Sequence, residues 1–189
     1  MIRSLAIGPE HGDLTVLTDA AGRGRRLAHR LTLEPEVWSV RVHFEQEEPT
    51  LGELCISTQS LRVVASGGGV TPLTSIDKGA IHHTMMSQLQ AKDHAEIVYT
   101  ARTIERSDAG YTLQGPLRIA GSTQPVSVEV TVEDDGEDYH LSTTCTLKQT
   151  DFGIRPYSAM LGSIRMADEV VVAWQVVVPK IEVAVAETD

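Results

Sequence analysis

The stretch Gly115–Val130, "GPLRIAGSTQPVSVEV", decides the fold class because two alternating patterns meet in it. Leu117 and Ile119 alternate with other residues in the first half, and three valines alternate with polar residues in the second. Residues 121–125, "GSTQP", are typical of a tight connection between the halves. The pattern therefore predicts two strands joined by a turn, each with one apolar face. What lies against that face, a packed core or a ligand, is the functional question.

The same alternation recurs along most of the chain. It is clear in 38–44, 54–58, 97–101, 141–147 and 170–178, with turn signals such as "SDAG" and "EDDGED" between segments. This spacing predicts about eight or nine antiparallel strands in a sandwich or a barrel. Periodicity alone does not choose between the two architectures, since both bury one apolar face of a sheet.

One segment has a helical period instead. Ile81, Met85 and Leu89 repeat every four residues, which predicts one amphipathic α-helix inserted at about 74–92. Ser75 or Asp77 is the expected N-terminal cap. The glycine-rich segment before it, Ser66–Gly69, is predicted to be a loop and lacks the lysine of a phosphate-binding P-loop.

Composition excludes several classes of function. The chain of 189 residues fits one domain, 1–189, with a short C-terminal tail at 179–189. A formal charge of −10 and 4% aromatic residues argue against broad attraction to nucleic acid or to an anionic membrane. Two distant cysteines indicate neither a disulfide scaffold nor a zinc site.

Targeting signals are also missing from the sequence. The apolar run Leu5–Ile7 is too short for the hydrophobic region of a signal peptide, and the run 170–178 is too short for a membrane-spanning helix. We therefore expect a cytoplasmic protein with no integral membrane segment.

No constellation of residues predicts catalysis, a metal or a cofactor. His82 and His83 are adjacent, so on a helix they point about 100° apart and cannot chelate one metal. No Gly-x-Ser-x-Gly nucleophile motif is present, and Asp151 in "DFG" lacks every other kinase element. His29 lies in a strand-like segment, where a hydrogen-bonded structural role is favoured over proton chemistry.

The chain resembles the YceI-like family of polyisoprenoid-binding, lipocalin-like proteins, in its actinobacterial branch. The resemblance rests on the Gly-x-Leu-x-Ile-x-Gly-x-Thr-x-Pro-Val signature, met by Gly115, Leu117, Ile119, Gly121, Thr123, Pro125 and Val126, and on "TDFGI" at Thr150–Ile154. It implies an eight-stranded antiparallel lipocalin-like barrel with one inserted helix. It also implies that a long apolar chain, such as a polyisoprenoid, occupies the lumen, and that two copies can pair as a homodimer.

A barrel of this size is either filled by side chains or holds one small ligand. The inward face has many medium-sized residues and the chain has only two phenylalanines, which favours a ligand. The predicted ligand-binding residues share inward positions on the strands or match the family's motifs. They are His29, Trp38, Val40, Val42, Ile97, Tyr99, Leu113, Leu117, Ile119, Val128, Phe152, Val172 and Trp174.

A weaker prediction concerns the head group of such a ligand. Arg25 and Arg26, in the basic cluster "GRGRR", could pair with a phosphate, although a solvated loop is the alternative. The sequence as a whole favours a non-enzymatic carrier or reservoir for a long-chain amphiphile. Two alternatives stay open: an interaction module with a packed barrel, and an enzyme acting on a lipid-like substrate.

Overall fold

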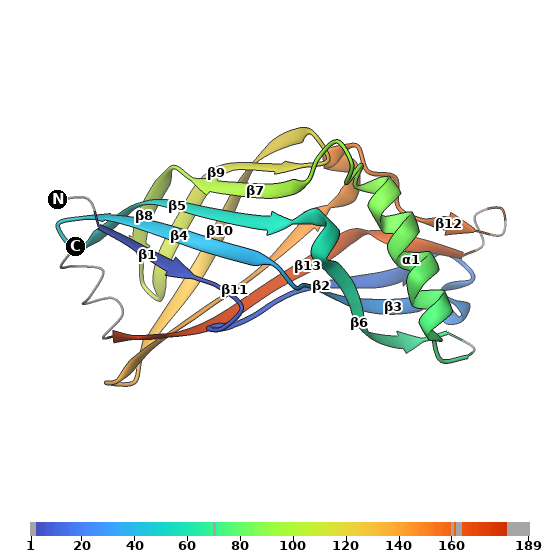
Figure 1. Ribbon diagram of the computed structural model, residues 1–189, viewed down its shortest axis with the longest axis horizontal. Helices are drawn as coiled ribbons and strands as arrows, with labels where there is room; N and C mark the ends of the chain where they lie inside the picture. The colour runs from blue at the N-terminus through green and yellow to red at the C-terminus, as the bar shows by residue number, and fades with distance from the viewer. Residues whose placement is uncertain (1–2, 70, 160, 162–163, 181–189) are drawn as a thin grey trace.

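The computed structural model describes residues 3–69, 71–159, 161 and 164–180, and it consists of one curled antiparallel sheet with one α-helix across its end (Figure 1). From position 181 onwards, the predicted C-terminal tail lies outside the described residues. The strands are β1 (Arg3–Ile7), β2 (Gly12–Ala21), β3 (His29–Pro35), β4 (Trp38–Glu45), β5 (Glu48–Ser57), β6 (Leu61–Gly68), β7 (Glu96–Ala101), β8 (Thr103–Ser107), β9 (Gly110–Ile119), β10 (Ser122–Asp134), β11 (Asp138–Lys148), β12 (Ser158–Ala159) and β13 (Ile164–Pro179). The helix α1 is Ser75–Gln88.

The strand pairings lead round the molecule and return to their start. β5 pairs with β7, and the path continues through β9, β10, β11 and β13 to β2, which pairs with β3. Only residues 36–37 separate β3 from β4, and the short 3-10 turn Thr58–Ser60 separates β5 from β6. Each of these pairs therefore forms the two halves of one long bent strand. The antiparallel lipocalin-like barrel predicted from the sequence is confirmed, although its strands are divided into thirteen segments among the described residues.

The hairpin of β9 and β10 has a tighter turn than the sequence analysis predicted. Ile119 pairs with Ser122, so the connection is the two residues Ala120 and Gly121 rather than 121–125. Both have positive φ, 48° and 79°, as a two-residue hairpin turn with the right twist requires. The strand therefore resumes at Ser122, and Pro125 lies within β10.

Gly115 of the same hairpin is needed for a close approach of two backbones. A Cβ atom built on Gly115 would lie 1.8 Å from the carbonyl oxygen of Thr100 in β7. No side chain fits there, and next to it the amide of Arg102 donates to Gln114 O at 2.9 Å. Gly115 thus allows the chain to cross from β7 to β8 directly over β9.

The helix begins and ends differently from the prediction. Its N-terminal cap is Thr74, which forms a capping box with Asp77: Thr74 Oγ1 accepts from the Asp77 amide, and the Asp77 carboxylate accepts from the Thr74 amide at 2.8 Å. The helix ends at Gln88, so the predicted range of 74–92 was too long by one turn. None of its residues is fully buried, and it lies across one end of the barrel (Figure 1).

Three other segments differ from the prediction. Ser66–Gly69 was predicted as a loop, yet β6 continues through Gly68 and pairs with His29 at the start of β3. β1 and β8 were not predicted at all, and each pairs with a longer neighbouring strand, β4 and β9 respectively.

Candidate ligand-binding site

The interior of the barrel holds a cavity of about 1300 Å³. Its wall includes residues from most of the strands and from α1, and it extends from Gln46–Glu48 in the β4–β5 hairpin to Ile81 and Met85 of the helix. Ligand pockets of roughly 300–1,000 Å³ already enclose drug-sized molecules. The cavity is therefore large enough for a long-chain molecule.

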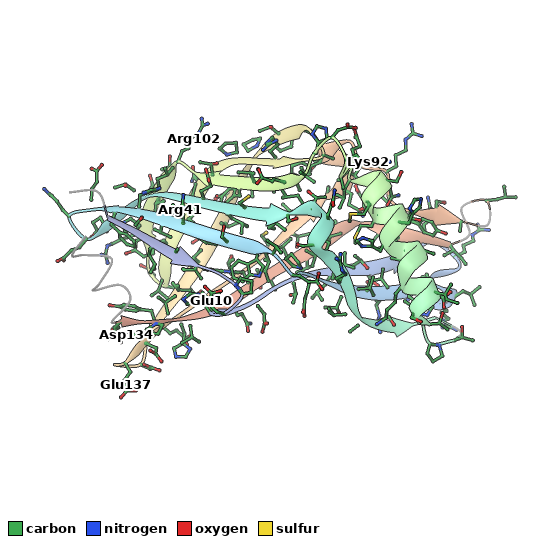
Figure 2. The ribbon with its side chains drawn as sticks, viewed as in Figure 1. Glu10, Arg41, Lys92, Arg102, Asp134 and Glu137 are labelled. Atoms are coloured by element: carbon green, nitrogen blue, oxygen red, sulfur yellow. The ribbon has the colours of Figure 1, made fainter. Side chains whose placement is uncertain are left out.

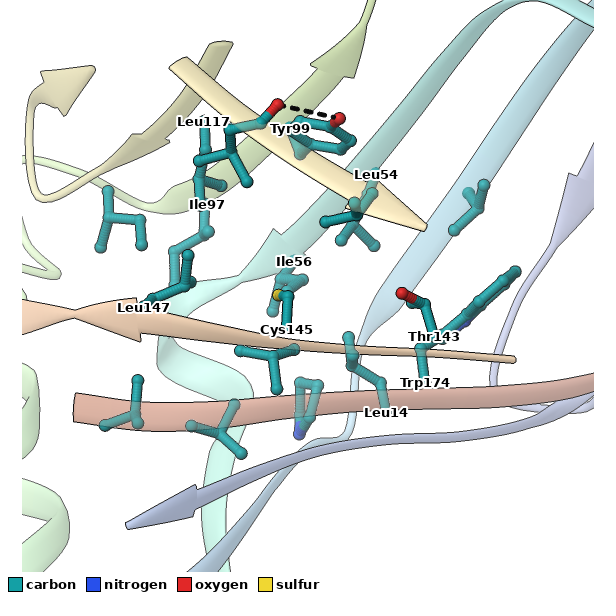
Figure 3. Close-up of a pocket in the computed structure, with 18 of the residues that line it drawn as sticks. Leu14, Leu54, Ile56, Ile97, Tyr99, Leu117, Thr143, Cys145, Leu147 and Trp174 are labelled. Atoms are coloured by element: carbon teal, nitrogen blue, oxygen red, sulfur yellow. Dashed lines mark hydrogen bonds between the residues drawn. The ribbon is translucent and has the colours of Figure 1, made fainter. Parts of the chain in front are cut away.

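Strand alternation explains why the wall is apolar. In β10, Val126 and Val128 face the cavity, whereas Ser127 and Glu129, which alternate with them, are exposed on the outside. The same holds for Leu117 of β9 and its exposed neighbour Arg118. These two valines are only half-buried, because they pack against the core cluster of Tyr99 and Leu117 on one side and face the cavity on the other. Figure 3 shows this apolar wall, with side chains from several strands converging on the lumen.

The structure places most of the predicted ligand-binding residues on the cavity wall. Those that line it are His29, Val40, Val42, Ile97, Tyr99, Leu113, Leu117, Ile119, Val128, Phe152, Val172 and Trp174. Trp38 does not line the cavity: it is 5% exposed and packs with Leu14 and Val176 in the core. That any of these residues contacts a ligand stays a prediction.

The predicted head-group residues also lie off the wall. Arg25 and Arg26 are exposed on a 3-10 turn, Arg25–Leu27, that connects β2 to β3. The next residues, Leu27 and Ala28, do line the cavity. At this end of the barrel the cations on the cavity wall itself are instead Lys148 and Arg165, which the sequence analysis did not select.

Sequence reasoning missed a further part of the wall, on the helix. Ile81, Met85 and Leu89 line the cavity, so the apolar face of α1 closes the barrel at this end. Their four-residue period was recognised as a helical stripe, which only indicates that one face is buried. The position of the helix over the lumen depends on the tertiary structure, which periodicity does not contain.

Two polar atoms in the wall have no hydrogen-bond partner among the described residues. They are Thr143 Oγ1 and Trp174 Nε1, both fully buried. The two residues lie opposite each other on β11 and β13, so both side chains project to the same side of the sheet (Figure 3). A buried polar atom without a partner typically costs about 1–3 kcal/mol of stability.

Two ionisable side chains of the lumen, Tyr99 and Cys145, are held in their neutral forms. Burial raises the pKa of Tyr99 to about 12, and its hydroxyl donates to Leu113 O at 3.0 Å. Burial also raises the pKa of the Cys145 thiol. Because the thiolate is the reactive form of cysteine, this environment makes Cys145 a poor nucleophile.

His29 positions the segment that leads into the helix. Its Nε2 lies 2.8 Å from the carbonyl oxygen of Thr71, which fits an imidazole N–H donating to that oxygen. A Cβ atom on Gly69, whose φ is 74°, would lie 2.2 Å from His29 Nε2, so the ring also packs flat against this glycine. This contact supports the predicted structural role of His29.

The remaining candidate residues have structural contacts of their own. His82 Nδ1 lies 3.0 Å from Leu61 O and connects α1 to β6. At the start of "TDFGI", the Thr150 amide and the Thr150 hydroxyl donate to the carboxylate of Asp168 in β13, at 2.9 Å and 2.6 Å. Within the described ranges, no three His, Cys, Asp or Glu side chains come together as metal ligands.

The fold and its cavity define the class: a lipocalin-like antiparallel barrel with an apolar lumen and a helix across one end. Sequence comparison gives the family. The model of the YceI-like domain matches residues 31–178, and the chain belongs to this family. A search of curated proteins finds no match.

Solved structures with the same fold are distant in sequence. BcnA of Burkholderia cenocepacia is 17% identical with a TM-score of 0.62, over 87% of this chain and 95% of that one. The YceI protein of Campylobacter jejuni is 15% identical with a TM-score of 0.58, over 78% of this chain and 83% of that one. A mutant of the Campylobacter jejuni protein was solved with a monobromobimane guest, at 14% identity and a TM-score of 0.59 over the same shares of the two chains. At these identities the likeness establishes the fold.

Membrane insertion by a helix finds no support in the part of the chain that is described. No helix there combines the length and the apolar character needed to cross a bilayer.

Proposed function

We propose that this protein binds one long-chain amphiphile, a polyisoprenoid or a similar lipid, in its lumen and acts as a non-enzymatic carrier or reservoir. The observation that carries the proposal is the cavity of about 1300 Å³ with its apolar wall. Each buried methylene contributes about 0.8 kcal/mol, so a long chain binds tightly there with few hydrogen bonds. Membership of the YceI-like family supports the same type of ligand.

The wall favours binding over catalysis. The groups that could react, Tyr99 and Cys145, have raised pKa values and remain protonated near neutral pH. Burial alone raises the pKa of the Cys145 thiol, and no basic side chain contributes to that change. A hydrolytic enzyme needs an activated nucleophile, and neither Tyr99 nor Cys145 is activated in this way.

The head group of the ligand is proposed to lie at the α1 end. Lys148 and Arg165 line the cavity there, together with His29. At the opposite end the charged wall residues are mainly acidic, Glu47, Glu48, Glu53 and Asp108, with Arg106 paired to Glu48 at 2.8 Å. An anionic head group is attracted to the first end and repelled from the second.

The proposal is tested by mass spectrometry of a solvent extract from protein purified without detergent. We expect a molecule with a long unbranched or isoprenoid chain, at close to one per protein molecule. If the extract is clean, titration with prenols and fatty alcohols follows. A clean extract together with no binding in that titration would refute the carrier role. Cytoplasmic location and pairing of two copies stay predictions.

A further inference from the structure

Large apolar side chains are exposed at the end of the barrel where α1 lies. The two most exposed in the described chain are Leu161, between β12 and β13, and Ile76, which is 83% exposed in the first turn of α1. Leu27, on the 3-10 turn between β2 and β3, is 51% exposed. These three segments project at the same end of the molecule (Figure 1). We call these three residues the apolar tip.

The basic cluster lies beside the apolar tip. Arg25 and Arg26 immediately precede Leu27, and both are exposed. Residues 19–30 contain four arginines and one carboxylate, Asp19, so this segment is locally cationic although the chain has a formal charge of −10. Asp77, next to Ile76, is the acidic side chain in the first turn of α1. The β10–β11 turn, Asp134 to Asp138, contributes acidic side chains at the opposite end, where Figure 2 shows Asp134 and Glu137.

The cavity reaches this same surface. Leu27, Ala28 and Tyr157 belong both to this end of the molecule and to the cavity wall. The helix that covers the lumen here has no fully buried residue. Two of the hydrogen bonds that connect it to the barrel are His82 Nδ1 to Leu61 O and Gln88 Nε2 to Arg155 O at 2.9 Å. A ligand that leaves the lumen beside α1 emerges at the apolar tip.

We propose that the α1 end of the barrel docks onto the surface of an anionic lipid bilayer, where ligand passes between the membrane and the cavity. Exposed apolar side chains next to arginines are the arrangement that interfacial segments use, with the apolar groups in the acyl boundary and the cations among anionic head groups. A basic residue near such a surface is attracted to it, and the attraction falls off within a Debye length. This inference goes beyond lumen binding, because a carrier can bind lipid without docking on a membrane.

The test is flotation of the full chain with vesicles of equimolar phosphatidylglycerol and phosphatidylcholine, against vesicles of phosphatidylcholine alone. We expect binding to the anionic vesicles at low salt and its loss when about 1 M salt shortens the Debye length to about 3 Å. Arg25→Gln with Arg26→Gln should weaken binding by about fivefold for each arginine removed. Ile76→Ser with Leu161→Ser should also weaken it, at unchanged charge.

The matched control removes the same charge elsewhere. Arg41 and Arg102 are exposed and lie away from α1 (Figure 2), so Arg41→Gln with Arg102→Gln should bind anionic vesicles as the parent protein does. Equal losses in both double variants would show that net charge alone matters and would overturn the proposal. No binding of the parent protein to anionic vesicles at low salt would overturn it as well and leave this surface to a protein partner.

A second measurement locates the contact. Leu161→Trp should be quenched by brominated acyl chains, whereas Val177→Trp, at an exposed apolar position near the far end of β13, should not. Quenching of both or of neither contradicts the proposal.

Binding of an uncharged long-chain alcohol, measured without vesicles, reports on the lumen separately. If the alcohol binds and the vesicles do not, docking is wrong and the proposed function stands; the reverse result removes the proposed function alone.

Discussion

Strand β4 passes through two different surroundings, although its inward side chains follow one pattern. Trp38, at its start, is 5% exposed and is enclosed by Leu14, Ile56 and Val176. Val40 and Val42, two and four residues later on the same face, line the cavity and are half-buried. Alternation therefore determines which side of the sheet a residue occupies. Whether a residue on that side lies in a packed core or faces open space depends on the side chains that the strands across the barrel direct toward it.

The difference in packing along β4 has an energetic consequence. In the region of Trp38 each inward side chain contacts others, so removal of atoms leaves a void and costs packing energy in addition to transfer energy. In the region of Val42 the lumen is already open, and removal of atoms only enlarges it. The first region supports the fold, and the second provides the wall of the site.

The largest expected effect is that of Trp38→Ala. Truncation of a packed tryptophan typically costs about 3–5 kcal/mol of the free energy of unfolding. Val42→Ala, four residues along the same strand, should cost only about 1 kcal/mol, because this valine faces the cavity, is partly exposed and, unlike Val40, does not pack against the cluster around Trp38. Equilibrium urea unfolding of the ligand-free proteins measures both. Similar losses at the two positions would mean that the two regions are packed alike.

Several parts of the fold could be predicted from the sequence because they depend on local patterns. The alternation in β4, β9 and β10 predicted inward positions that the structure confirms as interior, and the four-residue period predicted α1. The turn at Ala120–Gly121 was misplaced, because alanine rarely adopts a positive φ and the glycine signal alone suggested a longer loop. Strand β6 was also missed, since its pairing with β3 depends on the bend of the whole barrel.

The candidate site was less predictable than the fold, for a physical reason. The volume of a lumen depends on barrel geometry and on the helix across its end, and no short window of sequence contains either. Trp38 was assigned to the site because its position in the alternation is the same as that of Val40. The partner of His29, Thr71 O, and the unpaired atoms of Thr143 and Trp174 depend on contacts between distant strands and loops.

A smaller effect, of opposite sign, is expected at Thr143. Its hydroxyl is buried in the wall without a partner, so Thr143→Val keeps the shape and removes the unpaired polar atom. The free energy of unfolding should rise by about 1 kcal/mol. The neighbouring Thr144 is exposed on the outer face, so Thr144→Val should change stability by less than about 0.5 kcal/mol. Thermal and urea unfolding of both variants measure these changes in stability. A loss of stability in Thr143→Val would show that the hydroxyl has a hydrogen-bond partner in solution.

The smallest change in stability, and the sharpest test of the comparison, is expected for Ile119→Trp. Ile119 lines the cavity and is half-buried, and it also packs against the cluster that contains Leu117 and Phe152, so the added volume of an indole extends into the lumen. The free energy of unfolding should change by less than about 0.5 kcal/mol, while the affinity for a long-chain alcohol falls sharply because the indole occupies the path of the chain.

Val176→Trp is the matched substitution in the packed region: Val176 is 3% exposed and does not line the cavity. Overpacking there typically costs about 1–3 kcal/mol. Unfolding and ligand titration of the two variants should therefore give opposite pairs of results. If Ile119→Trp is destabilised as much as Val176→Trp and binds the alcohol as the parent protein does, the lumen beside β9 is packed and the ligand does not lie there.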